Sequence, residues 1–342
     1  MNKPSLALFV ALSLAVPALC SAQVKEKAAK PTKEYKEGVA LYRQYIDRVH
    51  KGGVWGGNAD NLPFIMEHGA KRGRSIVLVH GLTDSPCYMR ELAQVFYDRG
   101  YNVVGVRLRG HGTAPEDLQK ATLAQWQDDV NFGINTASIL GNEVSVAGFS
   151  TGGALILNAV YRRQQPNGPK WNLGDVYLFS PAIDLPFWTA IGVKGMCAVG
   201  TSVKGTPWAW GDDKTVEDNT CGYKKGALNG VCQLMTQIED NYSHINDINA
   251  GLKGHGVYIV ESAADATVSP TAVVDFSGAL PKGAEWDMTL YGSNEKIAHN
   301  AVTRSSTNPR FGELKAGVLE FIERCEVRHS PRALSLIDPK TH

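Results

Sequence analysis

The chain has 342 residues, of which 35 are Lys or Arg and 34 are Asp or Glu, for a formal net charge of +1. Because acidic and basic residues are well mixed, the composition indicates neither a nucleic-acid partner nor another polyanion. The length suffices for one large α/β domain with an insertion, or for two smaller domains.

The N-terminus (1–22) has the layout of a secretory signal peptide. A lysine precedes an apolar run from Leu6 to Val16, and small residues lead up to Ala22. We expect cleavage after Ala22 and export to the periplasm or the medium. Cys20 raises lipidation as an alternative, but the residues before it are not the usual small ones. No later stretch of sequence is long and apolar enough to predict a membrane span.

Residues 23–60 are predicted to form a leader and one helix. The stretch KEKAAKPTKEYKEG mixes lysines with glutamates, which favours a solvated leader over a binding patch. From Tyr35 to His50 apolar and charged residues alternate at helical spacing, which predicts an amphipathic helix. A glycine-rich loop, KGGVWGGNADN, follows.

Short apolar, β-branched runs then alternate with helical segments. The runs predicted as buried strands are 75–81, 102–108, 143–149, 175–180, 256–262 and 285–292, and the segments with helical periodicity are 88–99, 123–140 and 153–163. Parallel strands need crossover connections, which such helices supply. We therefore predict an α/β fold, with a mostly parallel sheet and helices on both faces, from residues 61–182 and 255–326. Its site should lie at the carboxyl ends of the strands.

One interval interrupts this alternation. Residues 181–254 contain no strong strand, and a structureless loop of that length is improbable in a compact domain. We therefore predict an inserted cap, or lid, at residues 183–254. A final helix at 312–325 precedes a C-terminal tail, 327–342.

Export would permit disulfides among the cysteines that follow the predicted cleavage site. These are Cys87, Cys197, Cys221, Cys232 and Cys325. The sequence does not choose among the possible pairings, but Cys221 and Cys232 are close in the chain, which makes them our first guess. No Cys/His spacing of a zinc site is present, and we predict neither a metal nor an organic cofactor.

The stretch VAGFSTGG is the strongest candidate for a catalytic motif. Ser150 ends a buried strand, has glycines two positions before and after it, and is followed by a helix opening. A sharp strand-to-helix turn of this kind exposes a nucleophilic hydroxyl at the top of a sheet. A phosphate-binding loop is the alternative, but no lysine stands at the Walker position and no GxGxxG motif occurs.

A serine nucleophile needs a base and an orienting acid, which follow it in the order acid, then histidine, on an open α/β sheet. Asp265 follows the predicted strand 256–262, and His299 follows the strand 285–292. We therefore predict a Ser150–His299–Asp265 triad. Glu261 and then Asp184 are the competing acids, and Asp265 has the alternative role of a helix cap.

Acyl transfer also needs two backbone N–H groups to receive an oxyanion. We predict the N–H of Thr151, directly after the nucleophile, and that of Leu82, in the loop HGLTDSP that follows the strand 75–81. His80 is interpreted as bracing this loop rather than as a second base.

Four blocks of sequence, HGLTDSPCYMRELAQVF, GYNVVGVRLRGHGTAPEDL, TLAQWQDDV and VAGFSTGGAL, occur in this order. Together they resemble the monoacylglycerol lipase and carboxylesterase branch of the α/β-hydrolases, also called the serine aminopeptidase-like or lysophospholipase-like group. The resemblance covers about 75–182 and resumes at 256–299. It implies the α/β-hydrolase fold, the same triad and the same two oxyanion donors.

Three features depart from this family pattern. Thr151 stands where methionine or glutamine is common, and the segment NAVTRSSTNPRFGE after His299 is longer than usual. The cap at 183–254, with its cysteines, has no close counterpart. Since caps shape substrate pockets, the resemblance is weakest for substrate identity.

We predict an exported serine hydrolase that cleaves carboxylic esters, such as monoacylglycerols, lysophospholipids or other short-to-medium acyl esters, through an acyl-enzyme on Ser150. Apolar cap residues are the candidates for contact with an acyl chain, although a cap core explains them equally well: Phe187, Trp188, Trp208, Trp210 and Met235. A peptidase or amidase, with Glu217 or Asp218 as amine anchor, is the first alternative. A binding protein on the same fold is the second. The predicted partner is a small acyl ester, with contact at a lipid surface possible, and the oligomeric state stays open.

Overall fold

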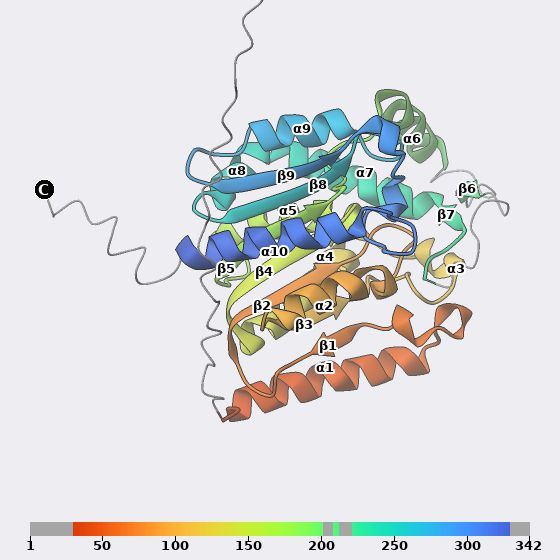
Figure 1. Cartoon of the computed structure of the whole chain (residues 1–342). Coiled ribbons are helices and arrows are strands. Elements are labelled where there is room, and N and C mark those ends of the chain that lie inside the picture. Colours follow the sequence, from red (N-terminus) through yellow and green to blue (C-terminus); the bar gives the residue numbers. More distant parts are fainter. Residues whose placement is uncertain (1–29, 201–207, 212–220, 329–342) are drawn as a thin grey trace, which may run out of the picture. The chain divides into compact units, whose positions relative to one another are not determined.

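The computed structural model describes residues 30–200, 208–211 and 221–328 (Figure 1), and the described residues from Pro31 onward form one structural unit. The predicted signal peptide and most of the predicted tail lie outside the described residues. Among the described helices, none has both the length and the apolar character that crossing a membrane requires.

A seven-stranded sheet forms the centre of this unit, in the order β1-β3-β2-β4-β5-β8-β9. The strands are β1 (Phe64–Met66), β2 (Arg72–Val79), β3 (Asn102–Val106), β4 (Gly141–Phe149), β5 (Leu173–Phe179), β8 (Gly256–Ser262) and β9 (Glu285–Tyr291). All neighbouring pairs are parallel except β1 with β3. The predicted parallel sheet is confirmed, and β1 is an antiparallel addition at its edge.

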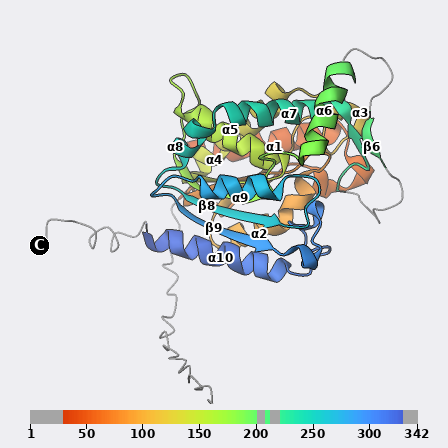
Figure 2. The same cartoon turned by 90° about the horizontal axis from the view of Figure 1, so that it is seen from above.

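Helices cover both faces of the sheet, as the alternation of strands and helices predicts. The α-helices of the described residues are α1 (Lys33–Lys51), α2 (Arg90–Asp98), α3 (Pro115–Leu118), α4 (Leu123–Leu140), α5 (Thr151–Gln164), α6 (Phe187–Gly200), α7 (Leu228–Ser243), α8 (Ile245–Leu252), α9 (Pro270–Gly278) and α10 (Phe311–Arg328), of which α3, α6 and α7 pack mainly against other parts of the chain than this sheet. Figure 2 shows α2 and α10 on one side of the sheet and α4, α5 and α8 on the other.

Side-chain alternation along β2 explains this layering. Ile76 and Leu78 point into the core with α2 and α10, whereas Val77 and Val79 point into the core with α4 and α5. All four are fully buried, because successive residues of a strand face opposite sides. A strand covered on both faces therefore reads as one continuous apolar run.

The segment between β5 and β8 is partly regular. It contains α6, the two-stranded sheet of β6 (Trp208–Gly211) and β7 (Lys225–Ala227), then α7 and α8. A disulfide between Cys197 in α6 and Cys232 in α7 joins the two helices. The boundaries of the cap, 183–254, and of the other predicted segments stay predictions.

The second disulfide corrects the first guess for the pairing. Cys221 bonds Cys87, which is 134 residues away in the sequence, and not Cys232. The guess was wrong because Cys232 lies in α7 against α6, while Cys221 lies beside the short helix Pro86–Met89. Cys325 is buried and takes part in neither of these disulfides.

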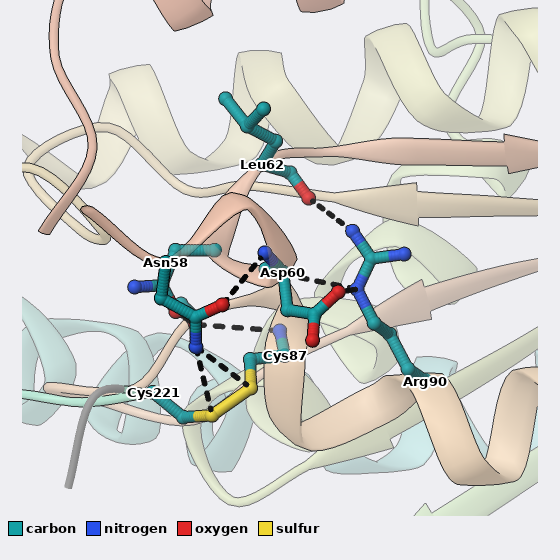
Figure 3. A network of polar contacts seen from close by, with 8 residues as sticks. Asn58, Asp60, Leu62, Cys87, Arg90 and Cys221 are labelled. Atoms are coloured by element: carbon teal, nitrogen blue, oxygen red, sulfur yellow. Dashed lines mark hydrogen bonds and ion pairs between the residues drawn. A yellow bond between two sulfur atoms is a disulfide. The ribbon is translucent and has the colours of Figure 1, made fainter. Parts of the chain in front are cut away.

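Figure 3 shows the surroundings of this second disulfide. The Asn58 amide nitrogen contacts both sulfurs, at 3.9 Å from Cys87 and 3.7 Å from Cys221. Nearby, Arg90 at the start of α2 forms an ion pair with Asp60, at 3.2 Å. The chain around Cys221 is thus attached to the segment that precedes β1 and to the loop that follows β2.

Candidate active site

Ser150 occupies a sharp turn between β4 and α5. Its φ of 52° lies in the left-handed region, which non-glycine residues rarely adopt. The flanking glycines make this turn possible, because a Cβ on Gly152 would lie 2.1 Å from the Val79 carbonyl oxygen and one on Gly148 would lie 2.5 Å from the backbone of Gly152. The Ser150 N–H donates to the Phe179 carbonyl at 3.0 Å, which holds the turn against β5.

His299 connects the nucleophile to an acid. Its Nε2 lies 2.9 Å from Ser150 Oγ, and its Nδ1 lies 2.5 Å from Asp265 Oδ2. Nδ1 must therefore donate to the carboxylate, which leaves Nε2 free to accept the serine proton. The His299 side chain is 12% exposed, and that of Asp265 is fully buried. The centroids of the Phe149 ring and the imidazole lie 4.9 Å apart.

Asp265 is fixed by the turn that follows β8. Its Oδ1 accepts the N–H groups of Thr267 and Val268 at 2.7 and 3.0 Å, so Oδ2 is the oxygen that faces His299. The alternative role as helix cap falls to Ser269, whose hydroxyl accepts the Ala272 N–H at the start of α9. Backbone hydrogen bonds of this kind favour the ionised carboxylate.

The two competing acids do not contact His299 in the described part of the chain. Asp184 accepts the N–H of Leu185. Glu261 is fully buried at the end of β8, where its Oε1 accepts from Ser180 and from Ser262. The structure thus brings together the three side chains that the sequence predicts as a triad, while their catalytic roles stay a prediction.

The two predicted oxyanion donors lie at the start of α5 and in the loop that follows β2. Thr151 is the first residue of α5, so its N–H has no partner within the helix. The N–H of Leu82 meets no acceptor within the described residues. Free N–H groups at a helix start and in a glycine-led loop suit a developing negative charge.

Buried histidines brace the loop that carries Leu82. His80 Nε2 accepts the Leu108 N–H at 3.1 Å, and its Nδ1 lies 2.8 Å from the Gly81 carbonyl. Burial holds the pKa of His80 well below its usual range and lowers that of the neighbouring His111 to about 4. Both rings are therefore neutral near pH 7, and His80 has the geometry of a brace.

Tyr223 is a residue that the sequence interpretation missed. Its backbone N–H donates to the Thr83 carbonyl at 2.7 Å, and its hydroxyl contacts the backbone of Gly110 and Thr113. It links the middle of the predicted cap to the loop after β2. The disulfide at Cys221 fixes the same stretch of chain, but no local sequence signal marks this link.

The predicted substrate contacts differ from one another. Phe187 is 69% exposed on α6, whereas Met235 is buried among apolar residues that include Val268 and, at the edge, Leu82. Met235 therefore belongs to a packed cluster next to the site rather than to an open wall. The side chains of Trp188, Trp208 and Trp210 lie outside the described residues, as do Glu217 and Asp218. Within the described ranges, no group of His, Cys, Asp and Glu side chains is arranged to hold a metal ion.

The order of the sheet and the elbow at Ser150 define an α/β-hydrolase fold. A model of the serine aminopeptidase (S33) family matches residues 70–291, which is more than half of the chain. The chain belongs to this family.

Two curated relatives match shorter regions. The thermostable monoacylglycerol lipase of Bacillus sp. (strain H-257) is 38% identical over 95 residues, which cover 28% of this chain and 37% of the relative. The carboxylesterase of Bacillus subtilis (strain 168) is 30% identical over 100 residues, which cover 29% and 39%. The matched regions thus span well under half the length of either relative.

Solved structures extend the likeness of fold. One of them comes from work on LipS and LipT, two metagenome-derived lipolytic enzymes. It superposes on this chain with a TM-score of 0.58 at 18% identity, over 78% of this chain and 98% of the other. A soluble variant of monoglyceride lipase from Saccharomyces cerevisiae gives 0.56 at 18% identity over 76% and 91%. At such identities the likeness shows the fold alone.

Proposed function

We propose that the protein is a serine hydrolase that cleaves carboxylic esters through an acyl-enzyme on Ser150. The observation that carries the proposal is the pair of contacts made by His299, at 2.9 Å to Ser150 Oγ and 2.5 Å to Asp265 Oδ2. A hydroxyl is a weak nucleophile, and a base oriented by a carboxylate is the arrangement that activates it.

The steps follow from this geometry. His299 Nε2 removes the Ser150 proton as Oγ attacks the ester carbonyl, and the imidazolium is stabilised by Asp265. The N–H groups of Leu82 and Thr151 would receive the oxyanion. His299 then protonates the leaving alcohol, and a water molecule, activated by the same histidine, hydrolyses the acyl-enzyme.

We propose acyl esters of short to medium chain length as the substrate class, with monoacylglycerols and lysophospholipids among them. The names of the relatives, a monoacylglycerol lipase and a carboxylesterase, support this class. Exposed apolar side chains on α6, which include Phe187 and Ile191, would suit an acyl chain or a lipid surface.

We further propose that the protein is exported, to the periplasm or the medium. Two disulfides, Cys87–Cys221 and Cys197–Cys232, support an oxidising compartment. The proposed signal peptide at 1–22 would direct this export, and Edman sequencing of protein from the periplasm and the medium should find Gln23 as the first residue. An intact N-terminus on protein in those fractions would contradict the cleavage.

A graded substrate panel tests the activity. Purified protein should hydrolyse p-nitrophenyl esters with a clear optimum in chain length, and also monoacylglycerol or lysophospholipid, while Ser150→Ala should not. Aminoacyl-p-nitroanilides run in parallel test the peptidase alternative that the family description suggests. Cleavage of the anilides without any ester hydrolysis would overturn the ester proposal in favour of that alternative.

A further inference from the structure

Glu261, the carboxyl that competes with Asp265 in the sequence, lies beside the proposed triad in a distinct role. It is the second-to-last residue of β8, and its side chain is fully buried. Its Oε1 accepts the Ser262 N–H at 2.7 Å and the Ser180 hydroxyl at 3.2 Å. Its Oε2 is also buried and meets no donor in the part of the chain that the structure describes.

The charged neighbour of this carboxyl is Asp265, which lies in the turn directly after β8, where its N–H donates to the Ser262 carbonyl at 2.9 Å. Two ionised carboxylates would present only acceptors to each other, so their closeness is favourable when one of them holds a proton. Asp265 is the poorer candidate, since it receives two backbone N–H groups and the imidazole of His299. Glu261 receives one N–H and one hydroxyl.

We propose that Glu261 is a positioning residue that holds its proton on Oε2 and donates it to Asp265. The inference rests on the proposed function, in which Asp265 orients His299. Burial and the nearby Asp265 raise the pKa of the Glu261 carboxyl to about 8. A neutral donor fixes Asp265 without adding a second negative charge near the place where the oxyanion forms.

Ser180 supplies an independent reason to regard this contact as built. It directly follows β5 and has a φ of 37°, a left-handed conformation that costs free energy for a serine. Its N–H donates to the Val260 carbonyl at 2.7 Å, and its hydroxyl donates to Glu261. The residue before it, Phe179, accepts the N–H of Ser150. The adjacent ends of β5 and β8 thus hold both Ser150, through Phe179, and Glu261, through Ser180.

The charged groups around Glu261 determine the pH dependence. Asp265 is the charged side chain that faces it, from the loop after β8, and His299 lies beyond Asp265. From β5 it meets the neutral Ser180 hydroxyl, and no ion pair to Glu261 occurs among the described residues. Ionisation of Glu261 above about pH 8 would therefore repel Asp265 and weaken its alignment with His299.

The test compares Glu261→Gln with Glu261→Ala. The amide of glutamine is neutral at every pH and can still donate to Asp265, whereas alanine cannot. Glu143→Gln is the matched control, because it makes the same substitution at the end of β4 that is far from Ser150. The readouts are the rate of Ser150 labelling by a fluorophosphonate probe from about pH 5 to 10, and thermal unfolding at the same pH values.

We expect the wild-type labelling rate to fall about threefold or more between about pH 7 and 9.5, whereas Glu261→Gln stays within about twofold over that range. At about pH 7 the glutamine variant should label within about threefold of the wild type, and the alanine variant at least about tenfold more slowly. Equal pH profiles for wild type and glutamine, or equal losses for glutamine and alanine, would overturn the inference. If Glu261→Gln does not fold, a wild-type rate that stays level to about pH 9.5 has the same consequence.

Thermal unfolding separates this inference from the proposed function. If wild-type protein is never labelled, the proposed function is refuted. The pH dependence of the Tm then still tests whether Glu261 holds a proton. A carboxyl with a raised pKa keeps a proton that the unfolded chain releases, so stability falls as the pH rises from 4.5 to about 8. The difference in Tm between Glu261→Gln and wild type should therefore grow by a few degrees over that window. A constant difference would contradict the proposal.

Discussion

The sheet edge that holds Ser150 and the segment 183–254 present contrasting surfaces. At the sheet edge the three proposed triad side chains are almost fully buried, and hydrogen bonds to one another and to nearby backbone N–H groups fix them. On α6 of the segment 183–254, the apolar side chains of Phe187 and Ile191 are at least half exposed. Groups that must meet within hydrogen-bonding distance need a rigid support, whereas a surface that admits an acyl chain does not.

The attachment of the segment to the sheet side qualifies this contrast. Cys221 is bonded to Cys87, and Tyr223 donates to Thr83 in the loop of the proposed oxyanion donor. The middle of the segment, around Cys221 and Tyr223, is therefore part of the support of the site, while α6 at its beginning is not. Four predictions, from the largest effect to the smallest, test this division.

The largest effect is expected for Asp265→Asn. The amide would favour the wrong tautomer of His299, and kcat/KM on a short ester should fall about 10³–10⁴-fold. Phe187→Ser is the control from the exposed side of α6 and should leave this rate within about threefold. Equal losses of activity in the two variants would contradict the proposed difference between the two regions.

The two disulfides provide the next comparison. In the chain-entropy account, Cys87→Ser with Cys221→Ser, which opens a loop of 134 residues, should lower the free energy of unfolding by up to about 5 kcal/mol. Cys197→Ser with Cys232→Ser opens 35 residues and should cost up to about 4 kcal/mol.

Denaturant unfolding measures these losses, and turnover of a short ester distinguishes the roles. We expect turnover to fall further without Cys87–Cys221, because that bridge holds the chain near the loop of Leu82. A larger loss of turnover without Cys197–Cys232 would show that α6 and α7 support the chemistry more than the attachment at Cys221 does.

A smaller effect on stability should come from the buried histidines beneath the loop. The pKa of His111 in the folded protein is about 4, against 6.5 for an ordinary histidine. The unfolded chain therefore binds a proton first as the pH falls, and stability should decrease by about 3 kcal/mol from pH 6.5 to 4 through this residue.

His111→Asn should remove that part of the acid lability, because the asparagine does not titrate. Chemical denaturation at the two pH values measures the difference. An unchanged loss in the variant would assign the acid lability to other groups, with His80 the first of them.

The smallest effect is expected for Thr151→Ala. The proposed oxyanion donor is the backbone N–H, and the hydroxyl of Thr151 has no partner within the described part of the chain. Turnover of a short ester should therefore stay within about threefold of the wild type. A loss near 10²-fold or more would instead give the hydroxyl a direct role in the reaction.

Much of the sheet edge could be predicted from the sequence. Continuous apolar runs mark strands that are covered on both faces, and Ser150 and Asp265 each follow such a run. His299 follows β9, which was predicted as a buried strand but is an edge strand with Trp286 and Leu290 exposed. The helix after Ser150 begins at Thr151, two residues earlier than predicted, because the turn passes directly into α5. The three-residue strand β1 escaped notice since so short a segment has no clear period.

Contacts between distant segments could not be predicted. The partner of Cys221 is 134 residues away, and closeness in the chain favoured the wrong pair. Glu261 could be placed next to the site, yet its protonation depends on burial and on Asp265, which only the folded chain brings together. The sequence predicted a cap at 183–254, but neither the helix α6 within it nor the exposed position of Phe187 and Ile191 on that helix.

The central claim is that Ser150 is a nucleophile activated by His299, and fluorophosphonate labelling tests it most directly. Intact-protein mass spectrometry of folded wild type should show one adduct, with peptide mapping to Ser150. Ser150→Ala should show none, and His299→Gln should label at least about 10²-fold more slowly. Wild-type protein that stays unlabelled, or labelling that is unchanged in His299→Gln, would contradict the account.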